Sequence, residues 1–208
     1  MFITGSSSEL RGALAGAHAT VEAQLRIAAA DRRDNVAPMP TDRMTTLTHL
    51  ADLNARLLFK AEPTNRLLDD ILDAGMRITG ADMGNIQLLN GHTGHLEIAV
   101  QRGFEAEFLD FFATVGDQEG ACGTAMSNGQ RTIVDDVTES PIFARTDAGV
   151  VLLRAGVRAV QSTPLRNHAD ELVGMLSTHC RRVYRPENQD LELLDWLVRL
   201  CRRLPLSH

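Results

Sequence analysis

The sequence predicts an α+β fold with an antiparallel sheet and a helical extension before it. Candidate strands come in consecutive pairs, and each pair is joined by a turn rich in Gly, Asn or Asp. Helical patterns lie before, between and after these pairs and do not alternate with single strands, as they would in a parallel sheet. Near Thr64, long helical periodicity gives way to short alternating segments. We therefore predict two domains, a helical extension at residues 1–60 and the α+β domain at residues 61–205.

Composition limits the classes of function. The chain has 208 residues, of which 44% are hydrophobic and 23% charged, as in ordinary globular proteins. A formal net charge of −6 gives no chain-wide basic field, so we expect no nucleic-acid partner. No apolar run approaches the roughly 18 residues of a membrane span, and the first residues do not resemble a signal peptide. We therefore expect a cytoplasmic protein without a membrane partner.

The sequence carries none of the common catalytic or metal-binding signatures. Its three cysteines show no CxxC spacing, and it has no HExxH pattern and no GxxxxGK[ST] loop. In a reducing compartment the cysteines are expected to be free thiols. We predict no metal site and no enzymatic activity.

The extension contains two predicted helices. Ser6 and Glu9 can form a capping box that opens the first helix, which continues to about residue 30. A charged, proline-containing linker follows near residues 31–41. The second helix begins near Thr41 and ends at or before Pro63.

The second domain contains the predicted sheet. In order, we expect a helix ending at residue 80, a hairpin of strands 85–89 and 96–100, helices 105–113 and 120–128, and a strand 131–134. A loop-like stretch 135–156 with helical pieces follows, then a second hairpin of strands 157–165 and 171–180, and a helix 187–204. The last helix has two apolar stripes. One stripe can cover the sheet, and the other needs the N-terminal helices or a second subunit, so we expect a homodimer.

Six blocks in this domain occur in an order that matches a known family. They are GNIQLL at 84–89, QRGF at 101–104, GACGTA at 120–125, VDDV at 134–137, GVRAVQSTPL at 156–165 and GMLSTH at 174–179. Over residues 64–204 the chain resembles GAF domains, in particular those beside PAS and histidine-kinase modules in bacterial sensors. The resemblance implies a PAS-like antiparallel sheet of about six strands with helices on both faces. Helices on one face would support dimerisation, and residues 135–156 would roof a ligand pocket on the other.

The resemblance also implies a function. GAF domains act in signal transduction as sensory or regulatory modules that bind small molecules. Their ligands include cyclic nucleotides, tetrapyrroles, haem and small metabolites, so the ligand and any cofactor stay unknown. We expect an unidentified small molecule, a homodimer that passes ligand state through its terminal helices, and an output through those helices or a separate signalling protein.

Four candidate ligand-binding residues come from the strands. Side chains alternate along a strand, so the second hairpin should place Ser162, Ser177 and His179 on one face. Polar groups on a covered face need partners, which a polar ligand, the roof backbone or water can supply. On the first strand, Gln87 shares a face with Asn85, and we take Gln87 as a candidate pocket residue.

Cys122 is the fifth candidate. It lies between glycines at the start of a short helix, where a lowered thiol pKa is physically possible, and the alternative is a small buried residue beneath the roof. One GAF subfamily, free methionine-R-sulfoxide reductase, is a thiol enzyme with a similar block around its cysteine. This chain has no cysteine before Cys122, and Val160, Ser177 and His179 stand where that subfamily has carboxylates. A thiol enzyme, a haem protein and a purely structural dimerisation module remain alternatives to a ligand sensor.

Overall fold

The computed structural model describes residues 41–59 and 64–203. The chain divides into two compact units, Met1–Ala61 and Glu62–His208. In the first unit the described element is helix α2 (Thr41–Phe59), which matches the second predicted helix of the extension. The first predicted helix and the linker lie outside the described residues. None of the described helices is both long and apolar enough to cross a membrane.

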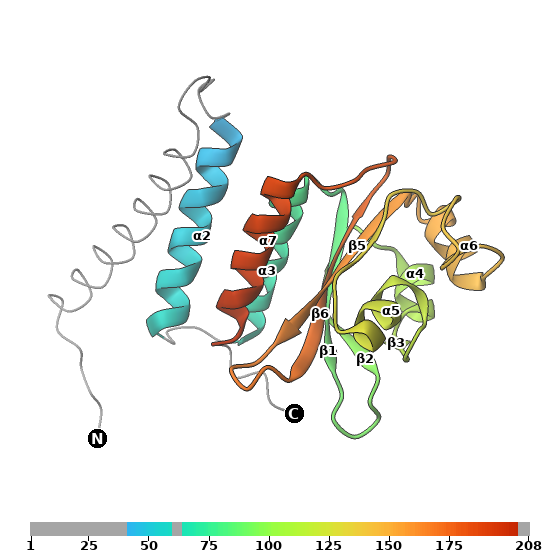
Figure 1. The fold of residues 1–208 in the computed structure, drawn as a ribbon, viewed down its shortest axis with the longest axis horizontal. Coiled ribbons are helices and arrows are strands. Elements are labelled where there is room, and N and C mark those ends of the chain that lie inside the picture. Colours follow the sequence, from blue (N-terminus) through green and yellow to red (C-terminus); the bar gives the residue numbers. More distant parts are fainter. Residues whose placement is uncertain (1–40, 60–63, 204–208) are drawn as a thin grey trace, which may run out of the picture. The chain divides into compact units, whose positions relative to one another are not determined.

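The second unit is built on a six-stranded antiparallel sheet (Figure 1). Its strands, in sheet order, are β3 (Thr114–Val115), β2 (Leu96–Arg102), β1 (Met83–Leu89), β6 (Leu172–Cys180), β5 (Ala159–Arg166) and β4 (Thr132–Val134). The two predicted hairpins, β1–β2 and β5–β6, meet at the centre of the sheet, where β1 pairs with β6. The predicted sheet is therefore confirmed.

Helices cover both faces of this sheet, as predicted. Figure 1 shows α3 (Thr64–Thr79) and α7 (Asn188–Cys201) on one face, and α4 (Ala106–Phe111), α5 (Gly120–Asn128) and α6 (Asp147–Arg154) on the other. A capping box between Glu187 and Asp190 fixes the start of α7. Thr146 caps α6 by accepting a hydrogen bond from the Gly149 backbone N–H at 3.1 Å.

The structure corrects one prediction around α4. A helix was predicted over residues 105–113, but α4 is shorter, because the chain extends at residue 114 to form β3. This two-residue strand pairs Val115 with Leu96 and Thr114 with Glu97 of β2. So short a strand has no alternating pattern of its own, and only its pairing with β2 defines it.

The register of the three central strands decides which side chains meet. Ser162 lies opposite Ser177, and Val160 lies opposite His179. On the other side of β6, Asn85 of β1 is opposite Ser177. Because alternate residues point to the same face, the second hairpin brings Ser162, Ser177 and His179 together as predicted.

Candidate functional site

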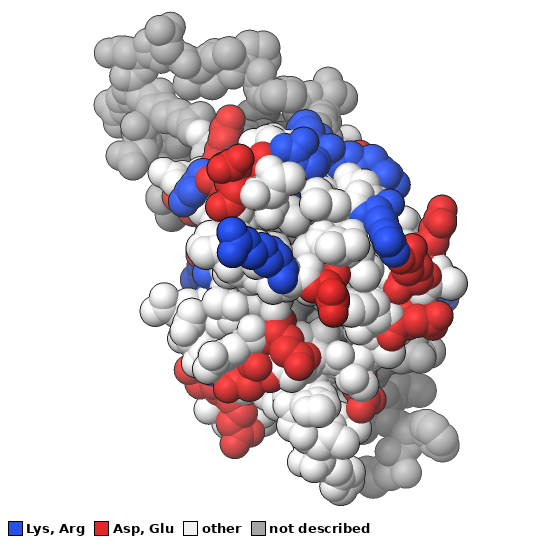
Figure 2. All heavy atoms as spheres, turned by 90° about the vertical axis from the view of Figure 1, so that its right-hand side faces the viewer, with Lys and Arg blue, Asp and Glu red and all other residues white. Residues whose placement is uncertain are grey.

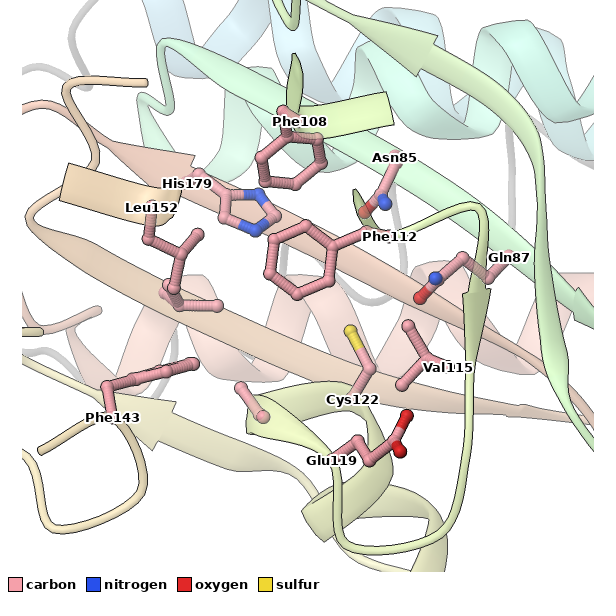
Figure 3. Close-up of a pocket in the computed structure, with 13 residues that line it drawn as sticks. Asn85, Gln87, Phe108, Phe112, Val115, Glu119, Cys122, Phe143, Leu152 and His179 are labelled. Carbon is pink, nitrogen blue, oxygen red and sulfur yellow. The ribbon is translucent and has the colours of Figure 1, made fainter. Parts of the chain in front are cut away.

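A small cavity lies between the sheet and the helices α4–α6 (Figure 3). It offers about 20 Å³ to the centre of a water molecule, which is room for one or two waters. The strands contribute Asn85, Gln87, Val115, Val160 and His179, and the helices and loops contribute Phe108, Phe112, Glu119, Gly120, Ala121, Cys122, Phe143 and Leu152.

Three polar side chains on the sheet face this cavity. Asn85, Gln87 and His179 are each at most 3% exposed. Within the described residues, the Oδ1 of Asn85, the Oε1 of Gln87 and the Nδ1 of His179 are buried and have no hydrogen-bond partner. Burying such a group without a partner costs roughly 1–3 kcal/mol. The described side chains around this cavity therefore leave three buried polar atoms without hydrogen-bond partners, and only a molecule inside the cavity could supply them.

The imidazole of His179 is held among phenylalanine rings. Phe104 meets it edge-on with ring centroids 4.9 Å apart, and Phe108 does so at 5.9 Å. Burial lowers the pKa of His179 to about 3. The imidazole is therefore neutral at pH 7, with one ring nitrogen able to accept a hydrogen bond and the other able to donate one.

The thiol of Cys122 sits over the two serines. Its Sγ lies 3.2 Å from Ser177 Oγ and 3.4 Å from Ser162 Oγ, and the two hydroxyls are 2.9 Å apart. Burial raises the pKa of Cys122, although hydrogen bonds to the serines act in the opposite direction. The position at the start of α5 therefore does not produce a reactive thiolate, and the thiol is neutral at pH 7.

Phe108 of α4 and Phe112, its C-cap residue, form much of the roof, which we had predicted at residues 135–156. Phe108 packs against Phe104 with ring centroids 3.6 Å apart, and against Phe112 at 4.6 Å. Of the predicted roof, residues 135–156, two members line the cavity, Phe143 and Leu152. The assignment of the roof to that stretch was therefore incomplete.

The structure brings the five candidate residues together around one site. Gln87, Cys122 and His179 line the cavity, whereas Ser162 and Ser177 lie beneath the Cys122 thiol and do not line it. Sequence analysis missed the Phe108 and Phe112 pair and Glu119. The four-residue spacing of the two phenylalanines was the available signal, since it places them on one side of a helical turn.

No group of three or more His, Cys, Asp or Glu side chains within residues 41–59 and 64–203 is placed to hold a metal ion. Cys180 and Cys201 are buried, and both have raised pKa values because of burial. On β6, Cys180 points to the opposite face from His179.

Comparison with known proteins identifies the family. The model of the GAF domain family matches residues 61–202, which is more than half of the chain. The chain therefore belongs to the GAF domain family, as its six sequence blocks predicted. No curated protein matches it.

Solved structures share the fold at low sequence identity. The chain resembles a domain of a two-component sensor histidine kinase protein from Sinorhizobium meliloti 1021, with a TM-score of 0.57, 17% identity, and 68% of this chain and 90% of that one covered. It resembles the GAF domain of a phosphoenolpyruvate-protein phosphotransferase from Coxiella burnetii, with a TM-score of 0.61, 12% identity, and coverage of 79% and 94%.

Free methionine-R-sulfoxide reductase from Neisseria meningitidis, solved with its substrate, is also similar in fold. The TM-score is 0.61 and the identity is 16%, with 83% of this chain and 95% of that one covered. At these identities the likeness extends to the fold alone.

Proposed function

We propose that this chain is a sensory domain in signal transduction that binds a small molecule between its sheet and its roof. The observation that carries the proposal is the set of unpartnered buried atoms on Asn85, Gln87 and His179, all facing one cavity. Buried polar groups are ordinarily hydrogen-bonded, and water or a ligand in the cavity can supply these partners; we propose that a ligand does so.

The size of the cavity indicates how binding would be sensed. A space for one or two waters does not admit a metabolite, so binding requires the roof to move away from the sheet. Phe112 is only partly buried and contacts the Phe108 ring at a tilt of 41°, so we propose that it moves with the roof when a ligand binds. Ligand binding and roof position are thereby coupled, which is what a sensor requires.

Arg131, which follows α5 in the chain, is hydrogen-bonded to both β5 and α7. The helix α5 carries Cys122 in its first turn and ends at Asn128, with Gly129 as its C-cap, shortly before Arg131. Arg131 donates through Nε to Thr163 Oγ1 of β5 at 2.8 Å and pairs through Nη2 with Asp195 Oδ1 of α7 at 2.5 Å. A shift of α5 on ligand binding would therefore be felt at α7.

We further propose that the protein is a homodimer and that ligand state changes the packing of α2 and α7 across it. Two apolar stripes on α7 suggest this step from the sequence. Leu194 and Cys201 of one stripe and Leu197 and Leu200 of the other are buried within one chain, so the homodimer is tested by its mass and not by this helix face. The output then passes through these helices or to a separate signalling protein.

A non-catalytic role is part of the proposal. Cys122 lines the cavity, so a thiol enzyme remains the alternative. Its raised pKa disfavours the thiolate that nucleophilic attack requires. Cys180 lies on the far face of the sheet and cannot readily resolve an oxidised Cys122. An assay with free methionine sulfoxide and dithiothreitol tests this, because turnover that is lost in Cys122→Ser would overturn the non-catalytic role.

Native mass spectrometry of the purified protein tests the binding function. We expect twice the 22.8 kDa mass of the chain plus an increment that disappears on denaturation. A bare dimer that no small molecule stabilises would favour a structural dimerisation module. Hydrogen exchange then tests the coupling: ligand should change exchange in α7, and Arg131→Gln should remove that change while binding persists.

A further inference from the structure

The interior of the cavity carries no charged group that is free to bind a ligand. Within residues 41–59 and 64–203 its ionisable lining residues are Glu119, Cys122 and His179, and no Lys or Arg is among them. The thiol and the imidazole are neutral at pH 7, because burial raises the pKa of Cys122 and lowers that of His179. Glu119 is exposed, and its Oε2 already accepts a hydrogen bond from the Gly116 backbone N–H at 2.8 Å.

The start of α5 is the other feature of the lining that could attract an ion. Gly120, Ala121 and Cys122 of its first turn line the cavity, and the N-terminus of a helix carries a partial positive charge. Glu119 is the N-cap residue of this helix, so its carboxylate lies beside that positive end. The carboxylate offsets the helix dipole, and this end of α5 therefore favours neither an anion nor a cation.

The polar side chains on the floor of the cavity can each donate and accept hydrogen bonds. Asn85 and Gln87 are two residues apart on β1, which places both amides on the same face of the sheet. Their oxygens are buried without a partner, and no hydrogen bond within the described part of the chain uses their NH₂ groups. The neutral imidazole of His179 donates through one ring nitrogen and accepts through the other. A ligand that only accepts, or only donates, therefore leaves part of the floor unpartnered.

An amide group in the ligand meets these conditions. It places a donor N–H beside an acceptor C=O and carries no charge, so it can bond to a side-chain amide through both atoms at once. A carboxylate offers acceptors alone and an amidinium offers donors alone, and each would enter a space without an opposite charge. Figure 3 shows Phe108, Phe112 and Phe143 around the same space, and their rings can cover an apolar part attached to the amide.

We propose that the cavity takes an uncharged molecule that carries an amide or lactam group on an apolar body. The amide exchanges hydrogen bonds with Asn85 and Gln87, and the apolar body lies against the phenylalanines of the roof. Ions of both signs are disfavoured, because they would lose their hydration without gaining a charged partner. This inference rests on the proposed ligand-binding function and adds the chemical class of the ligand.

The outer surface on the roof side does not favour ions of one sign either. Figure 2 shows the side of the molecule on which α4, α5 and α6 lie, and residues of both charges appear on it with uncharged residues between them. A surface of mixed charge does not concentrate ions of a single sign at the roof. Selection between charged and uncharged ligands therefore depends on the cavity itself.

The test uses the full chain and four probes of nearly the same shape: benzamide, benzoate, benzamidinium and acetophenone. The group on the ring is, in that order, an uncharged donor and acceptor, an anion, a cation and an uncharged acceptor. Binding at pH 7 is followed by ligand-observed NMR and by the thermal unfolding midpoint. We expect benzamide to bind about tenfold or more tightly than either ion, and about threefold or more tightly than acetophenone, which lacks the donor.

Two matched variants test where the probe binds. Gln87→Met removes one amide of the floor at nearly constant volume, and we expect it to weaken benzamide by about tenfold. Gln161→Met makes the same change on the opposite face of the sheet, and it should alter benzamide binding by less than about twofold.

The outcomes separate this inference from the proposed function. Equal or tighter binding of benzoate, benzamidinium or acetophenone, or an equal effect of the two glutamine variants, overturns the inference while ligand binding stands. A compound released from the native protein on denaturation is judged by its retention on ion-exchange resin and its accurate mass. An uncharged amide or lactam supports the inference, and an ionised compound or one without such a group overturns it. If no probe binds and the native protein carries no small molecule, the inference and the proposed function both fail.

Discussion

Two buried glutamines on opposite faces of one sheet should respond in opposite ways to the same substitution. Gln87 faces the cavity, and its Oε1 has no partner. Gln161 faces the other way and is fully engaged: its Nε2 donates to Thr163 Oγ1, and its Oε1 accepts from Thr178 Oγ1 at 3.3 Å. The two residues are 1% and 3% exposed, so burial does not distinguish them.

Methionine has nearly the volume of glutamine and no polar atom that requires a partner. Gln87→Met removes a buried acceptor whose desolvation costs roughly 1–3 kcal/mol, so we expect the free energy of unfolding to rise by about 1–2 kcal/mol. Gln161→Met leaves two threonine hydroxyls with one partner fewer, and we expect a loss of about 1–2 kcal/mol. In a protein of this size, each kcal/mol moves the unfolding midpoint by roughly 2–4 °C.

Urea denaturation and thermal unfolding, both followed by circular dichroism, measure the two variants side by side. The expected separation of about 2–4 kcal/mol between them exceeds the error of either method. If Gln87→Met were destabilised as much as Gln161→Met, Oε1 of Gln87 would have a firm partner inside the free protein. The argument that the cavity is built for a ligand would then lose its main support.

Three further predictions follow from the same region. Because the pKa of His179 is lowered by burial to about 3, the unfolded state binds a proton that the folded state does not between about pH 6.5 and pH 3. The free energy of unfolding should therefore fall by about 1.4 kcal/mol per pH unit as the pH decreases through that window. Denaturation measured at several pH values should show a smaller slope in His179→Gln. The control variant His168→Gln, whose side chain is exposed in a turn, should keep the slope. Iodoacetamide should label Cys122 of the native protein at least about tenfold more slowly than a free thiol, because its pKa is raised. Fast labelling detected by mass spectrometry would contradict a neutral, partly buried thiol. Gly123→Ala should destabilise the protein by about 1–3 kcal/mol in urea denaturation, since a Cβ there would lie 2.4 Å from the backbone oxygen of Gly116, and an unchanged midpoint would mean that the loop yields freely.

The floor of the site could be predicted because strands follow a simple rule. Once the turn between β5 and β6 was placed at residues 167–170, alternation put Ser162, Ser177 and His179 on one face. The structure has this turn, and Asp170 adopts the left-handed conformation there with φ of 67°. The same rule put Asn85 and Gln87 together on β1, where the amides now face the cavity.

The roof could not be predicted in the same way. Phe108 and Phe112 belong to or flank a helix of only six residues, too short for a clear periodic pattern. Their place over the sheet depends on β3, which exists only through its pairing with β2. Cys122 was located correctly, but the state of its thiol depends on contacts with Ser162 and Ser177, at sequence separations of 40 and 55 residues.

The sheet therefore places polar residues on both faces for two different purposes. On the face toward α7, the side chains of Gln161, Thr163 and Thr178 are linked by hydrogen bonds, and Arg131 donates to Thr163. The polar residues of this face therefore stabilise the fold. Toward the roof, Asn85 and Gln87 retain unpartnered oxygens at a cost to stability. A domain selected only as a dimerisation module gains nothing from that cost, because apolar side chains would pack the same space more favourably. The unequal treatment of equivalent amides on the two faces of one sheet is thus the strongest physical argument that this GAF domain binds a ligand.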